Sequence, residues 1–471
     1  MTELTPNASH RLAIELSYPV DEPQGQPAML AQITNTIAQL RGKIGDIVVA
    51  RETGDTIQRR LLVEAYSEEH GEALIDGLRS IPDLKVLKVC DQTMALHEGG
   101  KISVESRIPV KSQGDLAMAY TPGVGRVCRA IVDQPEKVFS LTIKGNTVAV
   151  ITDGSAVLGL GNLGAAGALP VMEGKALLFK EFADVDAFPI CLDTQDTEAI
   201  ITAVKQIAPV FGGINLEDIS APRCFEIEQR LRKELEIPVF HDDQHGTAIV
   251  VLAALMNGLK FVKKSLSAVK IVINGAGAAG IAIGRLLKEA GAKADKIILC
   301  DSKGMVSSDR ANLTPEKAEF AVHKSGSLAD AMVHSDIFIG VSVPGIVTPE
   351  MVSSMELNPI IMAMSNPIPE IQPELIANQV AVCATGRSDY PNQINNVLAF
   401  PGIFRGALNC RASMITTQMC LEAASAIASL ISPSELRANY IIPSVFDSRV
   451  VTAVAEAVEK TAQNEGVSSK Q

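Results

Sequence analysis

A glycine-rich segment in the second half of the chain has the residue types and the spacing that bind a pyrophosphate. The apolar run 270–274 leads directly into Gly275, Gly277 and Gly280, which form a Gly-x-Gly-x-x-Gly pattern, and the residues that follow have helical spacing. Glycines at these positions permit a tight turn and let the backbone approach a pyrophosphate at the N-terminus of the helix. The pattern predicts a dinucleotide-binding turn; the alternative is a glycine-rich turn that binds nothing.

An acidic residue follows at the position where the adenosine ribose of a dinucleotide would lie. Asp301 ends the next apolar run, 297–301, and comes 21 residues after Gly280. A carboxylate there accepts hydrogen bonds from the ribose hydroxyls and repels the 2′-phosphate of NADP. We therefore predict NAD as the cofactor. Use of NADP stays open, because Lys303 lies two residues further on and could weaken the preference.

Two short acidic clusters could bind a divalent metal ion. Glu217 and Asp218 form the first, and Asp242 and Asp243 follow the apolar run 237–240, which predicts a strand. Carboxylate oxygens are the ligands that Mg²⁺ and Mn²⁺ prefer. Adjacent Glu217 and Asp218 would point to opposite faces of a regular strand, so they could share an ion only at a strand end or a turn. Solvated or helix-capping acids are the alternative.

Two histidines flank the second acidic cluster. His241 and His245 are four residues apart, a spacing that invites a zinc interpretation. The zinc protease motif has a Glu directly after its first His, and this chain has Asp242 there. We therefore favour histidines that are hydrogen-bonded in a loop.

Four further side chains could transfer protons or orient a substrate. Tyr120 precedes a Pro-Gly turn, where a phenol can donate a proton. Lys175 opens an apolar run, where loss of solvent would lower its pKa toward the range of a base. Asn366 and Asn396 lie in loops, and a neutral amide can orient a carboxylate without titrating. Taken singly, the alternatives are a packed tyrosine, a surface lysine and turn-forming asparagines.

Composition excludes several classes of protein. Of 471 residues, 47% are hydrophobic and 20% are charged, which excludes a disordered chain, and the net charge of −12 excludes a basic surface for nucleic acid. Eight cysteines without a Cys-x-x-Cys pair fit reduced thiols. Apolar stretches such as 247–256 run about ten residues, whereas a membrane span takes about 20. We expect a cytoplasmic protein without a membrane or nucleic-acid partner.

Three predicted domains position these side chains. Residues 1–97 show strand and helix patterns in the order β-α-β-β-α-β, which is the ferredoxin-like arrangement. This unit resembles an ACT domain, a small regulatory module that often binds metabolites between paired copies; the alternative is a dimerisation or packing module. Residues 98–265 form a predicted α/β domain for substrate and metal, and residues 266–471 a Rossmann-type NAD-binding domain with C-terminal helices. The predicted fold class is α/β.

Taken together and in order, these segments resemble the malic enzyme family, in its short bacterial form. The resemblance covers about residues 101–463 and rests on the segments 120–124, 152–164, 173–175, 216–218, 241–247, 275–280, 365–367 and 395–402. It implies oxidative decarboxylation of L-malate to pyruvate and CO₂ with reduction of NAD(P), and oxaloacetate decarboxylation as a further activity. A malolactic-type decarboxylase, or a metabolite sensor with an inactive enzyme body, is the alternative.

The resemblance also assigns roles to residues. Lys175 is the implied general base, and Tyr120 is the implied acid that protonates C3 of enolpyruvate. The remaining roles are metal ligation by Glu217, Asp218 and Asp243, a place for Asp242 near Lys175, and orientation of substrate and nicotinamide by Asn366 and Asn396.

The resemblance further implies an assembly of subunits. A homodimer or homotetramer is expected, and in the short enzymes Tyr120 could act across an interface. A small-molecule effector could bind the ACT-like domain. Ser155-Ala-Val157 stands near the place where large eukaryotic relatives carry an Arg, so the group that neutralises the second substrate carboxylate is open.

Overall fold

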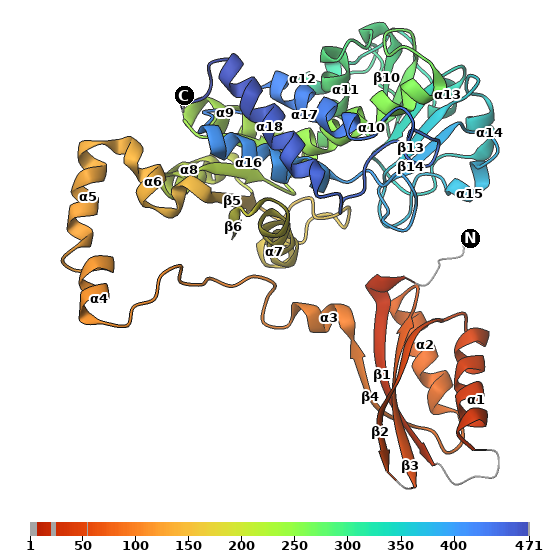
Figure 1. Cartoon of the computed structure of the whole chain (residues 1–471). Helices are drawn as coiled ribbons and strands as arrows, with labels where there is room; N and C mark the ends of the chain where they lie inside the picture. Colours follow the sequence, from red (N-terminus) through yellow and green to blue (C-terminus); the bar gives the residue numbers. More distant parts are fainter. Residues whose placement is uncertain (1–6, 20–24, 54, 470–471) are drawn as a thin grey trace. The chain divides into compact units, whose positions relative to one another are not determined.

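The structure is a computed structural model that describes residues 7–19, 25–53 and 55–469 (Figure 1). The chain divides into two compact units, Met1–Ser103 and Val104–Gln471. Each unit has a hydrophobic core of its own and is described by itself.

The N-terminal unit is a four-stranded antiparallel sheet with two helices. Its elements are β1 (Arg11–Pro19), α1 (Gly25–Gln39), β2 (Lys43–Thr53), β3 (Thr56–Glu64), α2 (Glu68–Arg79) and β4 (Lys85–Asp91), followed by α3 (Gln92–His97). The strand order is β2-β3-β1-β4. Ile14, Leu16, Leu61 and Val63 are buried at alternate positions of β1 and β3, the pattern of strands with one face on a core. The predicted ferredoxin-like order is confirmed.

The second unit contains a parallel sheet of four strands in the order β6-β5-β7-β8. Its strands are β5 (Thr147–Thr152), β6 (Asp186–Cys191), β7 (Gly213–Leu216) and β8 (Val239–His241), and its helices are α7 (Gly164–Ala183), α8 (Thr197–Ile207) and α9 (Arg223–Glu234). β5, β7 and β8 are buried throughout, because helices cover both faces of a parallel sheet.

A second sheet has the doubly wound order β11-β10-β9-β12-β13-β14. Its strands are β9 (Ile271–Asn274), β10 (Ile297–Asp301), β11 (Gly304–Met305), β12 (Ile337–Gly340), β13 (Ile360–Ala363) and β14 (Val382–Thr385). The helices along these connections are α11 (Ala278–Glu289), α12 (Pro315–Ala318), α13 (Leu328–Met332), α14 (Pro349–Ser353) and α15 (Pro373–Ile376). All pairs are parallel except β10 with β11. This is the predicted Rossmann-type arrangement.

Long apolar helices complete the second unit. They are α10 (Thr247–Val262), α16 (Phe400–Cys410), α17 (Thr417–Ser429) and α18 (Arg449–Asn464). With the π-helical turn before it, α10 spans Asp242–Val262, the one helix among the described residues that is long and apolar enough to cross a membrane. The uninterrupted apolar run 247–256 lies inside this helix and is followed by Asn257 and Lys260. However, 67% of its most apolar stretch is buried inside the protein, as in a core helix.

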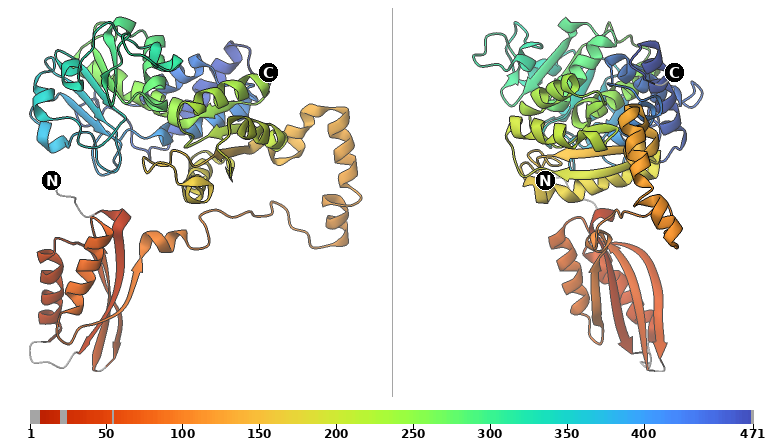
Figure 2. Two further views of the ribbon diagram at one scale, coloured as in Figure 1. Left: turned by 180° about the vertical axis from the view of Figure 1, so that it is seen from behind. Right: turned by 90° about the vertical axis from the view of Figure 1, so that its left-hand side faces the viewer.

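The segment of the second unit that precedes β5 has little contact with the rest of that unit. It carries α4 (Gln113–Ala119), α5 (Val124–Asp133) and α6 (Val138–Leu141). Figures 1 and 2 show α4 and α5 outside the sheets, with α6 leading back to them. None of the residues of α4 or α5 is buried, although Leu116, Met118 and Val132 are large and apolar.

Candidate active site

Acidic residues meet at the carboxyl ends of two neighbouring strands. β7 and β8 are parallel, and Leu216 pairs with His241 at their last position. Glu217 and Asp218 therefore leave β7 beside Asp242 and Asp243, which leave β8. The φ of +54° at Asp218 is a turn conformation, and this turn brings two adjacent carboxylates to one place.

Glu217, Asp218 and Asp243 form an oxygen set that fits a divalent cation. One carboxylate oxygen from each lies within 4.8 Å of the other two. Asp218 Oδ2 is buried and has no hydrogen-bond partner among the described residues. Burial raises the pKa of all three carboxyl groups, and the charge of Asp243 raises those of Glu217 and Asp218 further. A bound Mg²⁺ or Mn²⁺ would offset this repulsion with the hard oxygen ligands such ions prefer.

Lys175 projects from α7 into the same cluster and is only 7% exposed. Its Nζ lies 2.5 Å from Asp242 Oδ2, 3.0 Å from Glu217 Oε1 and 4.2 Å from the ring centre of Phe400. Burial by itself would lower the pKa of Lys175, but the carboxylates of Asp242 and then Glu217 outweigh it, so the pKa lies above its ordinary value. The expectation that loss of solvent lowers this pKa was wrong, because it left out the anions.

Asn366 and Asn396 belong to the half of the unit that contains the sheet β9–β14, called the dinucleotide half below. Asn396 connects this half to the acidic cluster. Asn396 Nδ2 donates a hydrogen bond to Asp242 Oδ2, the oxygen that Lys175 also contacts. Asn366 follows β13, and its amide lies against the backbone of Gly386, where a Cβ would come within 2.7 Å of it. Asn366 lies in the loop after β13, whereas Asn396 begins a short 3-10 helix, Asn396–Leu398, so the expectation of a loop was wrong for Asn396. Asn396 directly contacts Asp242, the residue that follows β8.

The glycine turn has the shape that a dinucleotide requires. Gly275 follows β9 with a φ of +120°, and a Cβ at Gly280 would lie 1.7 Å from the carbonyl oxygen of Gly275. A Cβ at Gly277 would meet nothing within 4 Å, so the backbone is open to a ligand at that point. Gly275 N donates to Cys300 O at 2.9 Å, which brings the turn beside Asp301 at the end of β10.

Tyr120 is a predicted catalytic residue that the structure does not bring to Lys175 and the acidic cluster. It follows α4, is 67% exposed, and lies in the segment that Figures 1 and 2 show apart from α7. Within a single chain it therefore has no contact with Lys175.

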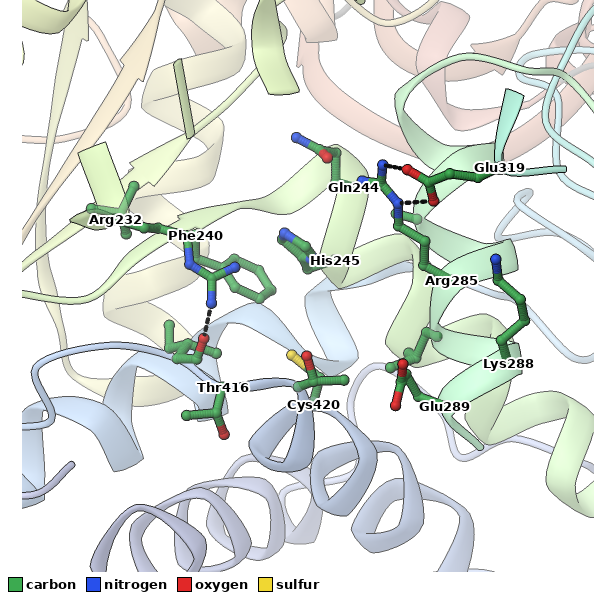
Figure 3. A pocket seen from close by; sticks show the side chains of 15 residues that line it. Arg232, Phe240, Gln244, His245, Arg285, Lys288, Glu289, Glu319, Thr416 and Cys420 are labelled. Carbon is green, nitrogen blue, oxygen red and sulfur yellow. Dashed lines mark hydrogen bonds and ion pairs between the residues drawn. The ribbon is translucent and has the colours of Figure 1, made fainter. Parts of the chain in front are cut away.

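The two histidines are not the hydrogen-bonded loop residues that we expected: His241 ends β8, and both of its ring nitrogens are buried without a hydrogen-bond partner among the described residues. His245 Nε2 lies 2.7 Å from the buried carboxylate of Glu228, and burial lowers the pKa of His241 to about 4. Figure 3 shows His245 beside a cavity of about 420 Å³ between α9, α11 and α17, with Arg232 and Arg285 on its wall. None of the predicted catalytic or metal-binding residues lines this cavity.

Sequence reasoning missed Arg223 at the start of α9. Its Nη2 lies 2.9 Å from the buried carboxylate of Asp153 and donates to Ser155 Oγ at 3.0 Å. Arg223 thereby holds the turn after β5 against Asp218, whose carbonyl accepts from Ala156 N at 2.9 Å. Asp153 and Arg223 are 70 residues apart, so no local pattern joins them.

The fold and the site define a class: an α/β oxidoreductase in which a Rossmann-type dinucleotide domain adjoins a cluster of carboxylates that could hold a divalent metal. Two family descriptions match the chain, "Malic enzyme, N-terminal domain" over residues 99–232 and "Malic enzyme, NAD binding domain" over residues 244–463. The chain belongs to the malic enzyme family.

Individual relatives agree with this assignment. The chain is 55% identical over 445 residues to the NAD-dependent malic enzyme of Geobacillus stearothermophilus, covering 93% of each chain. It is also 55% identical to the bifunctional malic/malolactic enzyme of Bacillus subtilis, covering 80% of this chain and 94% of that one. The crystal structure of the NAD-dependent malic enzyme of Thermotoga maritima superimposes with a TM-score of 0.75 at 48% identity, covering 79% of this chain and 99% of that one.

Proposed function

We propose that this chain oxidatively decarboxylates L-malate to pyruvate and CO₂, with NAD as the hydride acceptor and NADP as a second substrate. One observation carries the proposal: Lys175 and Asn396 contact the same oxygen of Asp242, next to the acidic oxygen set. A proton-transfer group, a metal site and a residue of the dinucleotide half thus meet at one point.

The residues divide the chemistry between them. A divalent ion held by Glu217, Asp218 and Asp243 would polarise the C2 oxygen of malate and offset the charges that raise the pKa of Lys175. Lys175 takes the proton of the C2 hydroxyl, and Asp242 holds the lysine in place. Asn366 and Asn396 orient the substrate and the nicotinamide, and Tyr120 returns a proton to C3 of enolpyruvate.

We also propose that Tyr120 acts in the site of a second copy of this chain, in a homodimer or homotetramer. The exposure of Tyr120 and of the apolar side chains of α4 and α5 supports this proposal, because such surfaces are normally covered by a partner. The same segment offers no contact to its own Lys175.

An assay with malate, Mn²⁺ and each nicotinamide cofactor tests the function. We expect NADH and pyruvate in equal amounts. The name of the Bacillus subtilis relative favours one second candidate, malolactic conversion. Lactate formed without net NADH would support that candidate. If malate is converted neither to pyruvate nor to lactate, both proposed functions are refuted.

For the organisation of the chain, we propose a regulatory domain at 1–97, a substrate and metal domain at 98–265 and an NAD domain at 266–471. The alignment with the Geobacillus enzyme covers 93% of the chain, more than the second unit alone, whereas the alignments with the Bacillus and Thermotoga enzymes cover 80% and 79%. Exposed apolar side chains on the edge strands, Val48 and Val49 on β2 and Leu87 on β4, support pairing with another copy.

Deleting residues 1–97 tests the regulatory role. We expect malate oxidation to persist, because the proposed catalytic residues all lie outside this segment, and any response to organic acids, amino acids or nucleotides to disappear. If the full-length and truncated enzymes respond identically to these metabolites, the segment is a structural module and not a regulatory one. The eight cysteines, all of them unpaired, support a location in the reducing cytoplasm.

A further inference from the structure

Glu370 is a buried carboxylate that bridges the loops after β12 and β13. The residue is fully shielded from solvent. Its Oε1 accepts a hydrogen bond from Ser342 N and its Oε2 accepts one from Ser365 N, each at 3.0 Å. A Cβ at Gly340 would lie 2.4 Å from the carboxyl carbon, so the carboxylate lies directly against the end of β12. Backbone N–H groups from two neighbouring strand ends thus converge on one anion.

Backbone N–H groups, not cations, compensate this carboxylate. Among the described residues, no Lys, Arg or His forms an ion pair with Glu370. Burial raises the pKa of Glu370, and the N–H groups of Ser365 and Ser342 offset part of that rise. A buried carboxylate that loses its hydrogen bonds is costly in free energy. Glu370 therefore favours loop conformations in which both N–H groups point at it.

The network extends to a third strand end, at β9. Asn274 Nδ2 donates to Ser342 Oγ at 2.7 Å, and Val341 N donates to Asn274 O at 2.9 Å. A Cβ at Gly275 would lie 2.3 Å from the carbonyl oxygen of Val341. The loop after β12 therefore packs against the glycine turn on one side and is bound to Glu370 on the other.

These loops border the crevice in which a doubly wound sheet binds a dinucleotide. The strand order reverses between β9 and β12, and ligands of such sheets bind outside the carboxyl ends of the strands at that point. With the adenosine half at the end of β10, beside Asp301, the nicotinamide half lies toward β12 and β13. Asn366, which the proposed function assigns to the nicotinamide, directly follows Ser365. Glu370 thus binds the loops of the nicotinamide side.

We propose that Glu370 is a positioning residue for the nicotinamide half of the cofactor, because its carboxylate holds the loops after β12 and β13 in the conformation that binds this half. The side chain is buried and acts through Ser342 and Ser365. The proposal rests on the dinucleotide site of the proposed function. If one of the two hydrogen bonds is lost, the loops adopt the binding conformation for a smaller fraction of the time, and the apparent affinity falls by that fraction.

Binding of NAD and of 5′-ADP to the full-length protein, measured by calorimetry without malate, tests the proposal. Glu370→Gln keeps the length of the side chain but presents an NH₂ group to one of the two N–H donors. Glu370→Asp keeps the charge but is one methylene shorter, so it cannot reach both donors. We expect both variants to bind NAD at least about tenfold more weakly than the wild type. Affinity for 5′-ADP, which occupies the adenosine half alone, should stay within about twofold.

Asp336→Asn is the matched control. The carboxylate of Asp336 accepts a hydrogen bond from Lys270 N at 2.8 Å, and these two residues directly precede β12 and β9. Asp336 therefore joins the amino ends of the same strands, away from the crevice. Its replacement should lower the melting temperature and leave both affinities unchanged, which separates positioning from a general loss of stability.

Three results would overturn the proposal. The first is wild-type NAD affinity in both Glu370 variants, or in whichever of the two folds. The second is an equal loss of NAD and 5′-ADP affinity, or failure of both variants to fold, because either result would make Glu370 a residue of the fold alone. The third is that the wild type binds neither nucleotide, which would refute the dinucleotide site as well; the first two leave the proposed function intact.

Discussion

Two buried lysines of this protein have pKa values shifted in opposite directions. Lys144 donates to the backbone carbonyls of Ala208, Pro209 and Phe211, and burial lowers its pKa. Lys175 is as little exposed, but it faces full negative charges, so its pKa rises. Carbonyl dipoles compensate a buried ammonium less than carboxylates do. The direction of the pKa shift of a buried lysine therefore depends here on whether carboxylates lie next to it.

Replacing Lys175 with Ala should lower kcat by about 10²–10⁴-fold, because the variant lacks the group proposed to take the C2 hydroxyl proton. The KM for malate should change less, since the metal site and the asparagines remain. Steady-state kinetics with Mn²⁺ and NAD measure both. Lys144→Met is the matched control: it should lower the melting temperature and leave kcat unchanged. Near-normal malate oxidation by Lys175→Ala would refute the role of the lysine.

Replacing Asp243 with Ala should greatly weaken Mn²⁺ binding, because an oxygen set of three loses one hard ligand. Calorimetric titration with Mn²⁺ and, separately, with NAD checks this, and NAD binding should persist. Asp336→Ala is the control: Asp336 pairs with Lys264 and accepts from Lys270 N, so this change should affect stability alone. If Asp243→Ala keeps wild-type Mn²⁺ affinity, Asp243 is not a ligand.

At the scale of elements, the strand-turn-helix unit β9–α11 uses its glycines for different purposes. Gly280 is needed for packing, because its Cα lies against the carbonyl of Gly275. Gly277 has ordinary backbone angles, with φ −95° and ψ −159°, and free space around it. Gly280 is therefore required by the fold, whereas Gly277 leaves space for a ligand.

This difference predicts separable effects. Gly280→Ala should destabilise the protein by about 1–3 kcal/mol, because a Cβ would overlap backbone that must move. Gly277→Ala should keep the wild-type melting temperature but weaken NAD binding, since its Cβ fills the space where the pyrophosphate approaches. Thermal melts and calorimetry separate the two. Wild-type NAD affinity in Gly277→Ala would show that the pyrophosphate does not approach at that residue.

At the scale of the whole molecule, the exposure of Tyr120 predicts that sites are shared between subunits. Tyr120→Phe and Lys175→Ala should each be nearly inactive alone. After subunit exchange, a hybrid dimer would hold one site with both native residues, so a random mixture should regain about one quarter of wild-type activity.

A second mixture controls this experiment. Asp243→Ala mixed with Lys175→Ala should regain nothing, because both residues belong to the site of their own chain, and each site of the hybrid lacks one of them. If the first mixture also stays inactive although exchange is demonstrated, Tyr120 does not act across an interface.

The sequence by itself determined the features that rest on local patterns. Alternating and helical periodicities predicted the β-α-β-β-α-β order of the N-terminal unit, and the glycine spacing predicted the turn between β9 and α11. Apolar runs that end in acids placed Asp242 and Asp301 at strand ends. These features depend on residues within one or two elements, so a linear pattern carries them.

Only the tertiary structure decided the electrostatics of the sites. The shift in the pKa of Lys175 comes from Asp242, 67 residues away, and the position of Asp242 depends in turn on Asn396, 154 residues further on. The charge around Asp301 comes from the fold of the loop that returns Arg310 and Lys317 to it. Coulomb interactions act through space and are decided by distance, which the order of residues along the chain does not contain.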